Sequence, residues 1–301
     1  KTQSSNHRKL TTMKAIQSDK PAVHIIAPDL LQPYNPVRVN LIGAGGTGSQ
    51  VLTALARINH SLIALQHPGL MVRVFDNDKV ELPNLGRQLF TTEEIGLYKS
   101  VALINRINRF FGTNWKAVTN LYNKETISGE PELAMSAITI SCVDTVPARF
   151  EIAAILKQIG KSSRHYRDTP TYWMDFGNSR DSGQVILSTV TSVKQPTSKR
   201  FHTVSALPFA TDEFKDLFSQ SQQSDDTPSC SLAEALTRQD LFINSALANM
   251  GASLLWQVFR EGMLFNRGLF LNLKDFRTQP LKVSVQESKV MPLKCHKQSK
   301  K

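Results

Sequence analysis

Four glycines and a serine lie close together near the start of the chain, in the segment Gly-Ala-Gly-Gly-Thr-Gly-Ser at residues 43–49. An apolar, β-favouring stretch precedes them at 37–42, an apolar helical pattern begins at Val51, and the glycine spacing satisfies G-x-G-x-x-G. Glycines let phosphate oxygens approach the main chain, and the N–H groups of the first helical turn then face the anion. The segment predicts a phosphate cradle; the alternative is a turn that only packs a helix onto a sheet.

Four charged residues accompany this turn in a consistent order. Asp76 and Asp144 each follow a predicted strand, and Arg87 and Lys99 lie between them. In a doubly wound sheet, the carboxyl ends of the strands and the loops after them converge on one crevice. Arginine offers phosphate a planar fork and lysine a point charge, while a carboxylate with phosphate oxygens suits Mg²⁺. Two cations and two carboxylates therefore favour a nucleoside triphosphate with Mg²⁺ over a dinucleotide.

Each of these residues also has a plainer interpretation. Arg87 and Lys99 are also typical of solvated surface positions, and Asp144 also fits the N-cap of the helix after it. Asp78 and Glu81 are more typical of loop solvation than of ligand binding. The joint order of the set favours the site.

The elements that must position these residues alternate between strands and helices. Strands are predicted at 37–42, 71–75, 115–120, 137–142, 172–176, 184–190, 269–273 and 281–285, and helices at 48–59, 99–111, 147–159 and 241–265. The pattern predicts an α/β fold with a Rossmann-like doubly wound sheet, mostly parallel, with antiparallel strands in the second half.

The chain divides into a central domain and two extensions. Residues 1–36 are expected to form an N-terminal extension, 37–286 one domain with a long crossover loop at about 191–229, and 287–301 a basic C-terminal tail. The net charge is +11, but residues 1–20 and 287–301 each carry five Lys or Arg and one acid, which leaves +3 for the rest. The tails are either solvated or make weak contact with a polyanion.

Cysteine usage and hydropathy limit the class of protein. Three cysteines, Cys142, Cys230 and Cys295, lie far apart, which indicates a reducing compartment without a disulfide framework. No C-x-x-C pair is present, so no zinc is expected. No apolar run approaches the roughly 20 residues of a membrane helix, and the first 20 residues lack a signal-peptide core. We expect a cytoplasmic protein without a membrane partner.

Longer motifs make a family resemblance plain. The chain carries D-x-D-x-V-x-x-x-N-L-x-R-Q at 76–88, I-G-x-x-K at 95–99 and C-x-D at 142–144, after the cradle at 43–49. With these motifs it resembles the ThiF/MoeB/HesA superfamily of ubiquitin-activating-type adenylyltransferases. Its C-terminal half, around 229–244, resembles a narrower bacterial branch, the ThiF-related protein of the PRTRC cassette that also encodes a ParB-related protein.

The resemblance implies an activity. Family members bind ATP and Mg²⁺ and adenylate the C-terminal carboxylate of a small ubiquitin-like or sulfur-carrier protein. It implies that Asp76 binds the ribose, that Asn84, Arg87 and Lys99 bind the phosphates, and that Asp144 lies near Mg²⁺. It assigns the rest of the nucleotide site to the cradle and to the glutamine after Arg87, namely Gly43, Gly45, Gly46, Gly48, Ser49 and Gln88.

The chain departs from the family pattern in two respects. Many members carry two C-x-x-C zinc pairs, and many carry an Arg-Tyr-x-Arg-Gln segment near the N-terminus whose arginine reaches the partner subunit's ATP. Neither is present here. The source of an arginine across a dimer, and with it the homodimer itself, stays open.

Cys230 is the candidate for a second step, in which a thiol takes the activated carrier as a thioester. It precedes Ser231 and Glu234, which fit a helix start with a capping box, and a helix N-terminus lowers the pKa of a nearby thiol. Asp225 and Asp226 act in the opposite sense. The setting resembles the crossover loop where thioester-forming relatives carry their cysteine, whereas Cys142 is interpreted as core and Cys295 as incidental.

Two other functions compete with adenylation. An NAD-dependent oxidoreductase also fits G-x-G-x-x-G with a downstream acid, but it gives no reason for Asn84, Arg87, Gln88 or Lys99. A non-catalytic scaffold with basic tails would not need to keep both Arg87 and Lys99.

Overall fold

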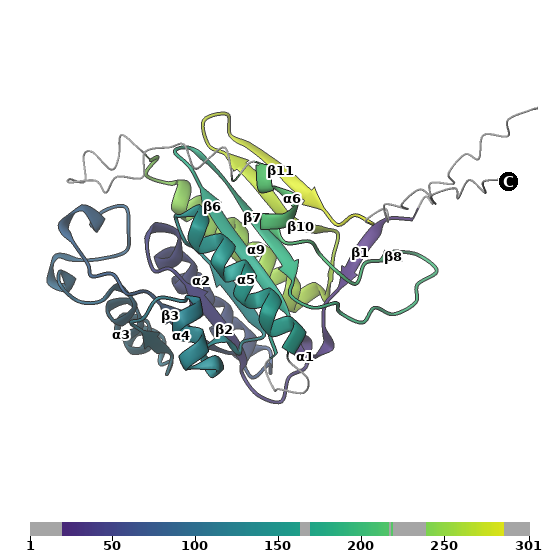
Figure 1. Ribbon diagram of the computed structural model, residues 1–301, viewed down its shortest axis with the longest axis horizontal. Coiled ribbons are helices and arrows are strands. Elements are labelled where there is room, and N and C mark those ends of the chain that lie inside the picture. The colour runs from purple at the N-terminus through teal and green to yellow at the C-terminus, as the bar shows by residue number, and fades with distance from the viewer. Residues whose placement is uncertain (1–19, 163–168, 217, 219–238, 286–301) are drawn as a thin grey trace, which may run out of the picture.

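The computed structural model describes residues 20–162, 169–216, 218 and 239–285. They build an eight-stranded sheet in the order β11-β10-β7-β6-β5-β2-β3-β4, beside a smaller sheet in the order β8-β1-β9 (Figure 1). The large sheet confirms the predicted α/β architecture.

One half of the large sheet is parallel. It consists of β2 (Val37–Ile42), β3 (Leu70–Phe75), β4 (Lys116–Val118), β5 (Ile138–Ser141) and β6 (Tyr172–Asn178). Parallel neighbours need crossover connections, and most of the helices supply them. All five strands therefore end at the same edge of the sheet, where the residues that follow them come together.

The other half is antiparallel, as expected for the second half of the chain. A hairpin joins β6 to β7 (Ser182–Thr189), and β10 (Asn266–Asn272) pairs with β7 and with β11 (Arg277–Lys282). The direction of the sheet thus changes at β6.

Helices cover both faces of the sheet (Figure 1). The first face packs against α2 (Gly46–Ala64), α3 (Lys99–Phe111) and α9 (Ile243–Glu261), and the second against α5 (Val146–Ser162) and the short α4 (Lys124–Gly129). Strands covered on both sides are apolar throughout rather than alternating, which explains why β2 is buried at every position except Arg38. No described helix is both long enough and apolar enough to span a bilayer.

The smaller sheet was not expected from the sequence. It joins β1 (Ala22–Ile25), β8 (His202–Thr203) and β9 (Met263–Leu264), and α1 (Pro28–Leu31) follows β1. Part of the expected N-terminal extension is therefore ordered, and the described part of the expected crossover loop contains β8 and α6 (Ala210–Glu213). The described residues also include three 3-10 turns: η1 (Leu82–Asn84), η2 (Thr92–Glu94) and η3 (Pro131–Ala134).

A fully buried histidine anchors β1 to the rest of the fold. His24 Nδ1 donates to the Val204 carbonyl at 2.6 Å, so neutral Nε2 accepts from the Tyr172 hydroxyl at 2.9 Å. The same hydroxyl accepts from the Ala27 amide at 3.1 Å. Burial lowers the pKa of His24, and the bond to Val204 opposes this shift. The histidine is held in its neutral form, because a proton on Nε2 would leave the Tyr172 hydroxyl hydrogen without its acceptor.

We predict that His24 makes the free energy of unfolding depend on pH. Its folded pKa lies below the unfolded value of 6.5, so the unfolded state takes up the proton first as the pH falls. Stability is therefore lost as the pH drops through 6.5 towards the folded pKa, by at most about 1.4 kcal/mol per pH unit. Urea unfolding at several pH values should show this slope in the wild type and a flatter one in His24→Gln. The control is His60→Gln, at an exposed position on α2, and an equal slope in wild type and His24→Gln would contradict the prediction.

Candidate functional site

Two glycines of the cradle allow the first turn of α2 to lie directly against the strand ends. Gly43 has φ +90°, a left-handed conformation, and a Cβ there would lie 2.7 Å from the Cys142 carbonyl oxygen. A Cβ on Gly48 would lie 1.9 Å from the carbonyl oxygen of Gly43. Any side chain at either position would push the helix away from the sheet.

A third glycine has a different reason to lack a side chain. A Cβ on Gly45 would meet no atom of the described residues within 4 Å, so none of them requires glycine there. Gly45 is also the N-cap of α2, and no side chain caps the helix. Among the described residues, the first amide groups of α2 therefore have no capping side chain, and uncapped amides at a helix N-terminus can bind an anion.

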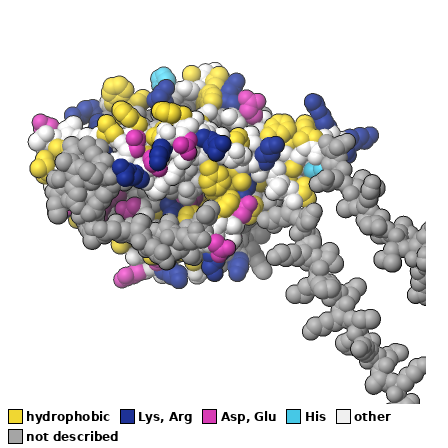
Figure 2. Space-filling view, turned by 90° about the horizontal axis from the view of Figure 1, so that it is seen from above, with side chains coloured by type: hydrophobic (Ala, Val, Ile, Leu, Met, Phe, Trp, Pro, Cys, Tyr) yellow, Lys and Arg dark blue, Asp and Glu magenta, His cyan; other side chains and the backbone are white. Residues whose placement is uncertain are grey.

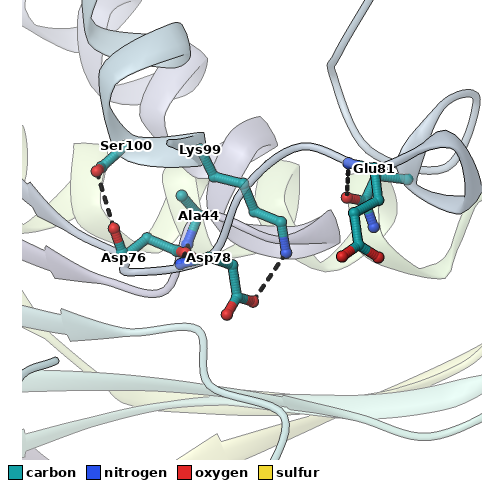
Figure 3. A network of polar contacts seen from close by, with 7 residues as sticks. Ala44, Asp76, Asp78, Glu81, Lys99 and Ser100 are labelled. Atoms are coloured by element: carbon teal, nitrogen blue, oxygen red, sulfur yellow. Dashed lines mark hydrogen bonds and ion pairs between the residues drawn. The ribbon is translucent and has the colours of Figure 1, made fainter. Parts of the chain in front are cut away.

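Asp76, at the end of β3, ties the cradle to the next two segments. Its Oδ2 accepts from the Ala44 amide at 2.6 Å and its Oδ1 from the Asp78 amide at 2.9 Å, while its carbonyl accepts from the Ser100 hydroxyl at 2.9 Å (Figure 3). Burial raises the pKa of Asp76, and the bond from Ala44 and the charge of Lys99 oppose this shift. The carboxylate thus lies beside the cradle, where the sequence places the ribose-binding acid.

Lys99 is the first residue of α3, and its side chain points back to the loop after β3 (Figure 3). Its Nζ lies 2.9 Å from Asp78 Oδ2, with the lysine side chain 10% exposed and the aspartate side chain 65% exposed. Asp78 was interpreted from the sequence as loop solvation, and the structure makes it the partner of Lys99. Lys99 is therefore mostly buried, whereas the carboxylate that it pairs with is open to solvent and screened by it.

The loop that carries Asn84, Arg87 and Gln88 packs its polar groups inward. Asn84 Oδ1 accepts from the Glu81 amide at 2.9 Å and so caps η1. Arg87 Nε and Gln88 Oε1 are buried and lack a hydrogen-bond partner among the residues that the structure describes. Burial lowers the pKa of Arg87, and the charge of Asp144 opposes this shift, so these two predicted residues are electrostatic neighbours.

Ser49 lies within the protein rather than at its surface. It is fully buried, its hydroxyl donates to the Gly46 carbonyl at 3.1 Å, and it accepts from the Leu89 amide at 3.3 Å. The side chain therefore fastens the loop of Arg87 and Gln88 to the cradle helix.

A buried ion pair beside Asp144 was not expected from the sequence. Arg149 Nε donates to Asp175 Oδ1 at 3.0 Å, and Nη2 donates to the carbonyls of Val143 and Phe176, each at 3.0 Å. Burial raises the pKa of Asp175, and Arg149 opposes this shift. The pair holds the backbone that leads into the exposed Asp144. The signal was a lone acid inside an apolar strand, since unpaired buried acids are rare.

Only one of the three cysteines falls on described residues. Cys142 packs against the main core, and burial raises the pKa of its thiol well above the usual value. Cys230, the proposed nucleophile, and Cys295 lie outside the described residues.

Charge on the described surface is mixed. On the face in Figure 2, Lys and Arg side chains are interspersed with Asp and Glu, in line with the near balance expected for the central domain. Within the described part of the chain, no group of three or more His, Cys, Asp and Glu side chains could hold a metal ion.

Known proteins are similar in sequence to part of this chain. Ubiquitin-like modifier-activating enzyme 5 of Culex quinquefasciatus is 31% identical over 146 residues, which are 43% of this chain and 34% of that protein. The Aedes aegypti protein of the same name is 31% identical over 138 residues, 41% of this chain and 32% of that protein. The chain thus spans about a third of the length of these curated relatives.

Solved structures share the fold. PaaA has a TM-score of 0.56 at 16% identity, covering 84% of this chain and 74% of that chain. MccB of E. coli, solved with ATP, has a TM-score of 0.52 at 16% identity, covering 84% and 65%. The model of the ThiF family matches residues 18–291, which include both sheets, the cradle and the loops around it. The chain therefore belongs to the ThiF family.

Proposed function

We propose that this chain uses ATP and Mg²⁺ to adenylate the C-terminal carboxylate of a small ubiquitin-like or sulfur-carrier protein. Family membership supports an adenylation-type activity, as do relatives named ubiquitin-like modifier-activating enzymes and a structural neighbour solved with ATP. The same neighbour has also been solved with MccA.

One observation carries the proposal: the cradle is open only where an anion would lie. Gly43, Gly46 and Gly48 are each closed by the chain's own atoms, whereas Gly45 faces free space beside an uncapped helix. Arg87 has a buried Nε without a partner among the described residues, which is costly unless a ligand completes it. A polyphosphate supplies what both features lack.

The adenylation step needs positive groups placed beside the phosphates, and it needs no covalent bond to the protein. A carboxylate oxygen of the carrier attacks the α-phosphorus, the bond from phosphorus to the bridging oxygen breaks, and pyrophosphate leaves. Arg87 and Lys99 donate to phosphate oxygens and offset the growing charge on the leaving group. Asp144 is the carboxylate that would hold Mg²⁺ together with phosphate oxygens, and the ion would supply further neutralisation.

The first test addresses nucleotide choice. Calorimetry should show binding of Mg·ATP and none of NAD, and Gly45→Ala should weaken ATP binding at least about tenfold, or about 1.4 kcal/mol, because its methyl group fills the open space. Its thermal midpoint should stay close to that of the wild type, since no protein atom lies near. The matched control, Gly48→Ala, should instead lose about 1–3 kcal/mol of stability through overpacking. NAD binding without ATP binding would favour an oxidoreductase, and binding of neither would favour a scaffold.

The second test addresses catalysis. In ATP–pyrophosphate exchange with small carrier proteins from the same locus, Arg87→Ala and Lys99→Ala should each lower the rate by about 10²-fold or more, as for a lost transition-state donor. Asp144→Ala should raise the Mg²⁺ concentration required. Arg109→Ala, at an exposed position in the last turn of α3, is the control. Near-normal exchange in all three site variants would show that the assigned site is wrong.

The third test addresses Cys230, which we propose as the thiol that accepts the activated carrier. The thiolate would attack the carbonyl carbon of the acyl-adenylate, form the thioester and release AMP. A carrier adduct should therefore appear on a non-reducing gel, disappear with added thiol, and be absent in Cys230→Ala. An adduct that persists in that variant, or none in a wild type that adenylates, would rule the step out.

Four finer proposals rest on the sequence. They are membership of the PRTRC branch, a homodimer, weak contact of the basic tails with a polyanion, and a cytoplasmic location.

A further inference from the structure

A buried asparagine to which the sequence assigned no role in the site contacts the cradle. Asn244, in the first turn of α9, is 3% exposed. Its Oδ1 accepts from the Thr47 hydroxyl at 2.8 Å and from Asn178 Nδ2 at 3.1 Å, and its Nδ2 donates to Gln239 Oε1 at 3.0 Å. One amide thus joins the first turn of α2, the end of β6 and the residue at which the described chain resumes.

The amide of Asn244 also explains why residue 46 is a glycine, which neither the backbone at the strand ends nor an open space explains. A Cβ on Gly46 would lie 2.5 Å from Asn244 Nδ2 and 2.8 Å from its Cγ. Gly46 therefore lacks a side chain because Asn244 occupies that side of the helix, whereas Gly45 faces the open side. The first turn of α2 is held between Asn244 and the space that an anion would fill.

Loss of this contact would change the anion site through Thr47. The Thr47 side chain is 5% exposed, and without Asn244 its hydroxyl would be buried without an acceptor. Threonine hydroxyls in that state turn to nearby backbone groups, and the nearest backbone is the cradle itself. Anion affinity depends on the placement of these amides, and displacements well below 1 Å matter at such sites.

We propose that Asn244 is a positioning residue for nucleotide binding, which acts through Thr47 to fix the amides of the cradle. This inference rests on the proposed function, since it assumes that the cradle binds ATP. Asn244 touches no substrate in this assignment.

The experiment is a double-mutant cycle on the full chain, with Mg·ATP as the probe in calorimetry. Asn244→Ala should raise the Kd about tenfold, and Thr47→Val should raise it less, since only the hydroxyl is removed. The double variant should bind no more weakly than Asn244→Ala alone, because both changes break one path. The control is Asn249→Ala on the same helix, whose amide donates to the Ser245 carbonyl at 2.9 Å and is exposed; its Kd should match that of the wild type.

A merely structural role would give a different result. Asn244→Ala would then lower the thermal midpoint while the Kd of the folded protein stayed within about twofold of the wild type, and this outcome overturns the proposal. The proposal is also overturned if the increase in Kd of the double variant equals the product of the increases of the two single variants. If Asn244→Ala does not fold, Thr47→Val and Asn178→Ala decide, and an unchanged Kd in both overturns it. A wild type that binds no ATP rejects the proposed function itself, which separates the two failures.

Discussion

The close approach of α2 to the end of β2 is the constraint on which the rest of the site depends. With Gly48 against the carbonyl of Gly43, the helix begins where the strand ends, and its first amides point over the edge of the sheet. Five parallel strands end at the same edge, so Asp76 and the loop that leads to Asp144 arrive beside those amides without further adjustment. A methyl group on Gly48 would push α2 away from the sheet, and would thus move the first amides of the helix away from the Asp76 carboxylate.

The two cations beside the cradle, Lys99 and Arg87, each interact with a solvent-exposed acid. Lys99 is mostly buried, but its partner Asp78 is mostly exposed, so the pair gains little from Coulomb attraction in water. Arg87 is partly desolvated, which lowers its pKa, and the charge of the exposed Asp144 opposes this shift. Among the described residues, both cations therefore lack a strong ionic partner. This is why we propose that they bind the phosphates of a nucleotide. In contrast, Arg149 and Asp175 are both buried and pair with each other, and Arg149 also donates to two backbone carbonyls, as expected of a pair that holds backbone rather than ligand.

Most of the site could be predicted because its residues lie in local motifs tied to strand ends. The cradle, Asp76 and Lys99 follow from spacing along the chain, and the register of β2 with β3 brings the cradle and Asp76 together. The pairing of Lys99 with Asp78 could not be predicted, because it depends on the path of an irregular loop. Nor could Asn244, which reaches Thr47 across 197 residues. The small sheet was missed for another reason: β8 and β9 have two residues each, too few for any periodicity.

The change of direction at β6 has a consequence for the site. If the strand after β6 ran parallel to it, a crossover helix would follow β6, whereas the hairpin to β7 keeps the residue after β6 close to the sheet edge. Asn178 is the last residue of β6, and it donates to Asn244, which bonds to the cradle. Two residues earlier, the Phe176 carbonyl accepts from Arg149, whose other bond holds the backbone before Asp144. The end of β6, where the hairpin to β7 begins, thus braces both the cradle and the Asp144 loop. A chain with the same cradle motif but a crossover after β6 would have to support those two segments by separate contacts.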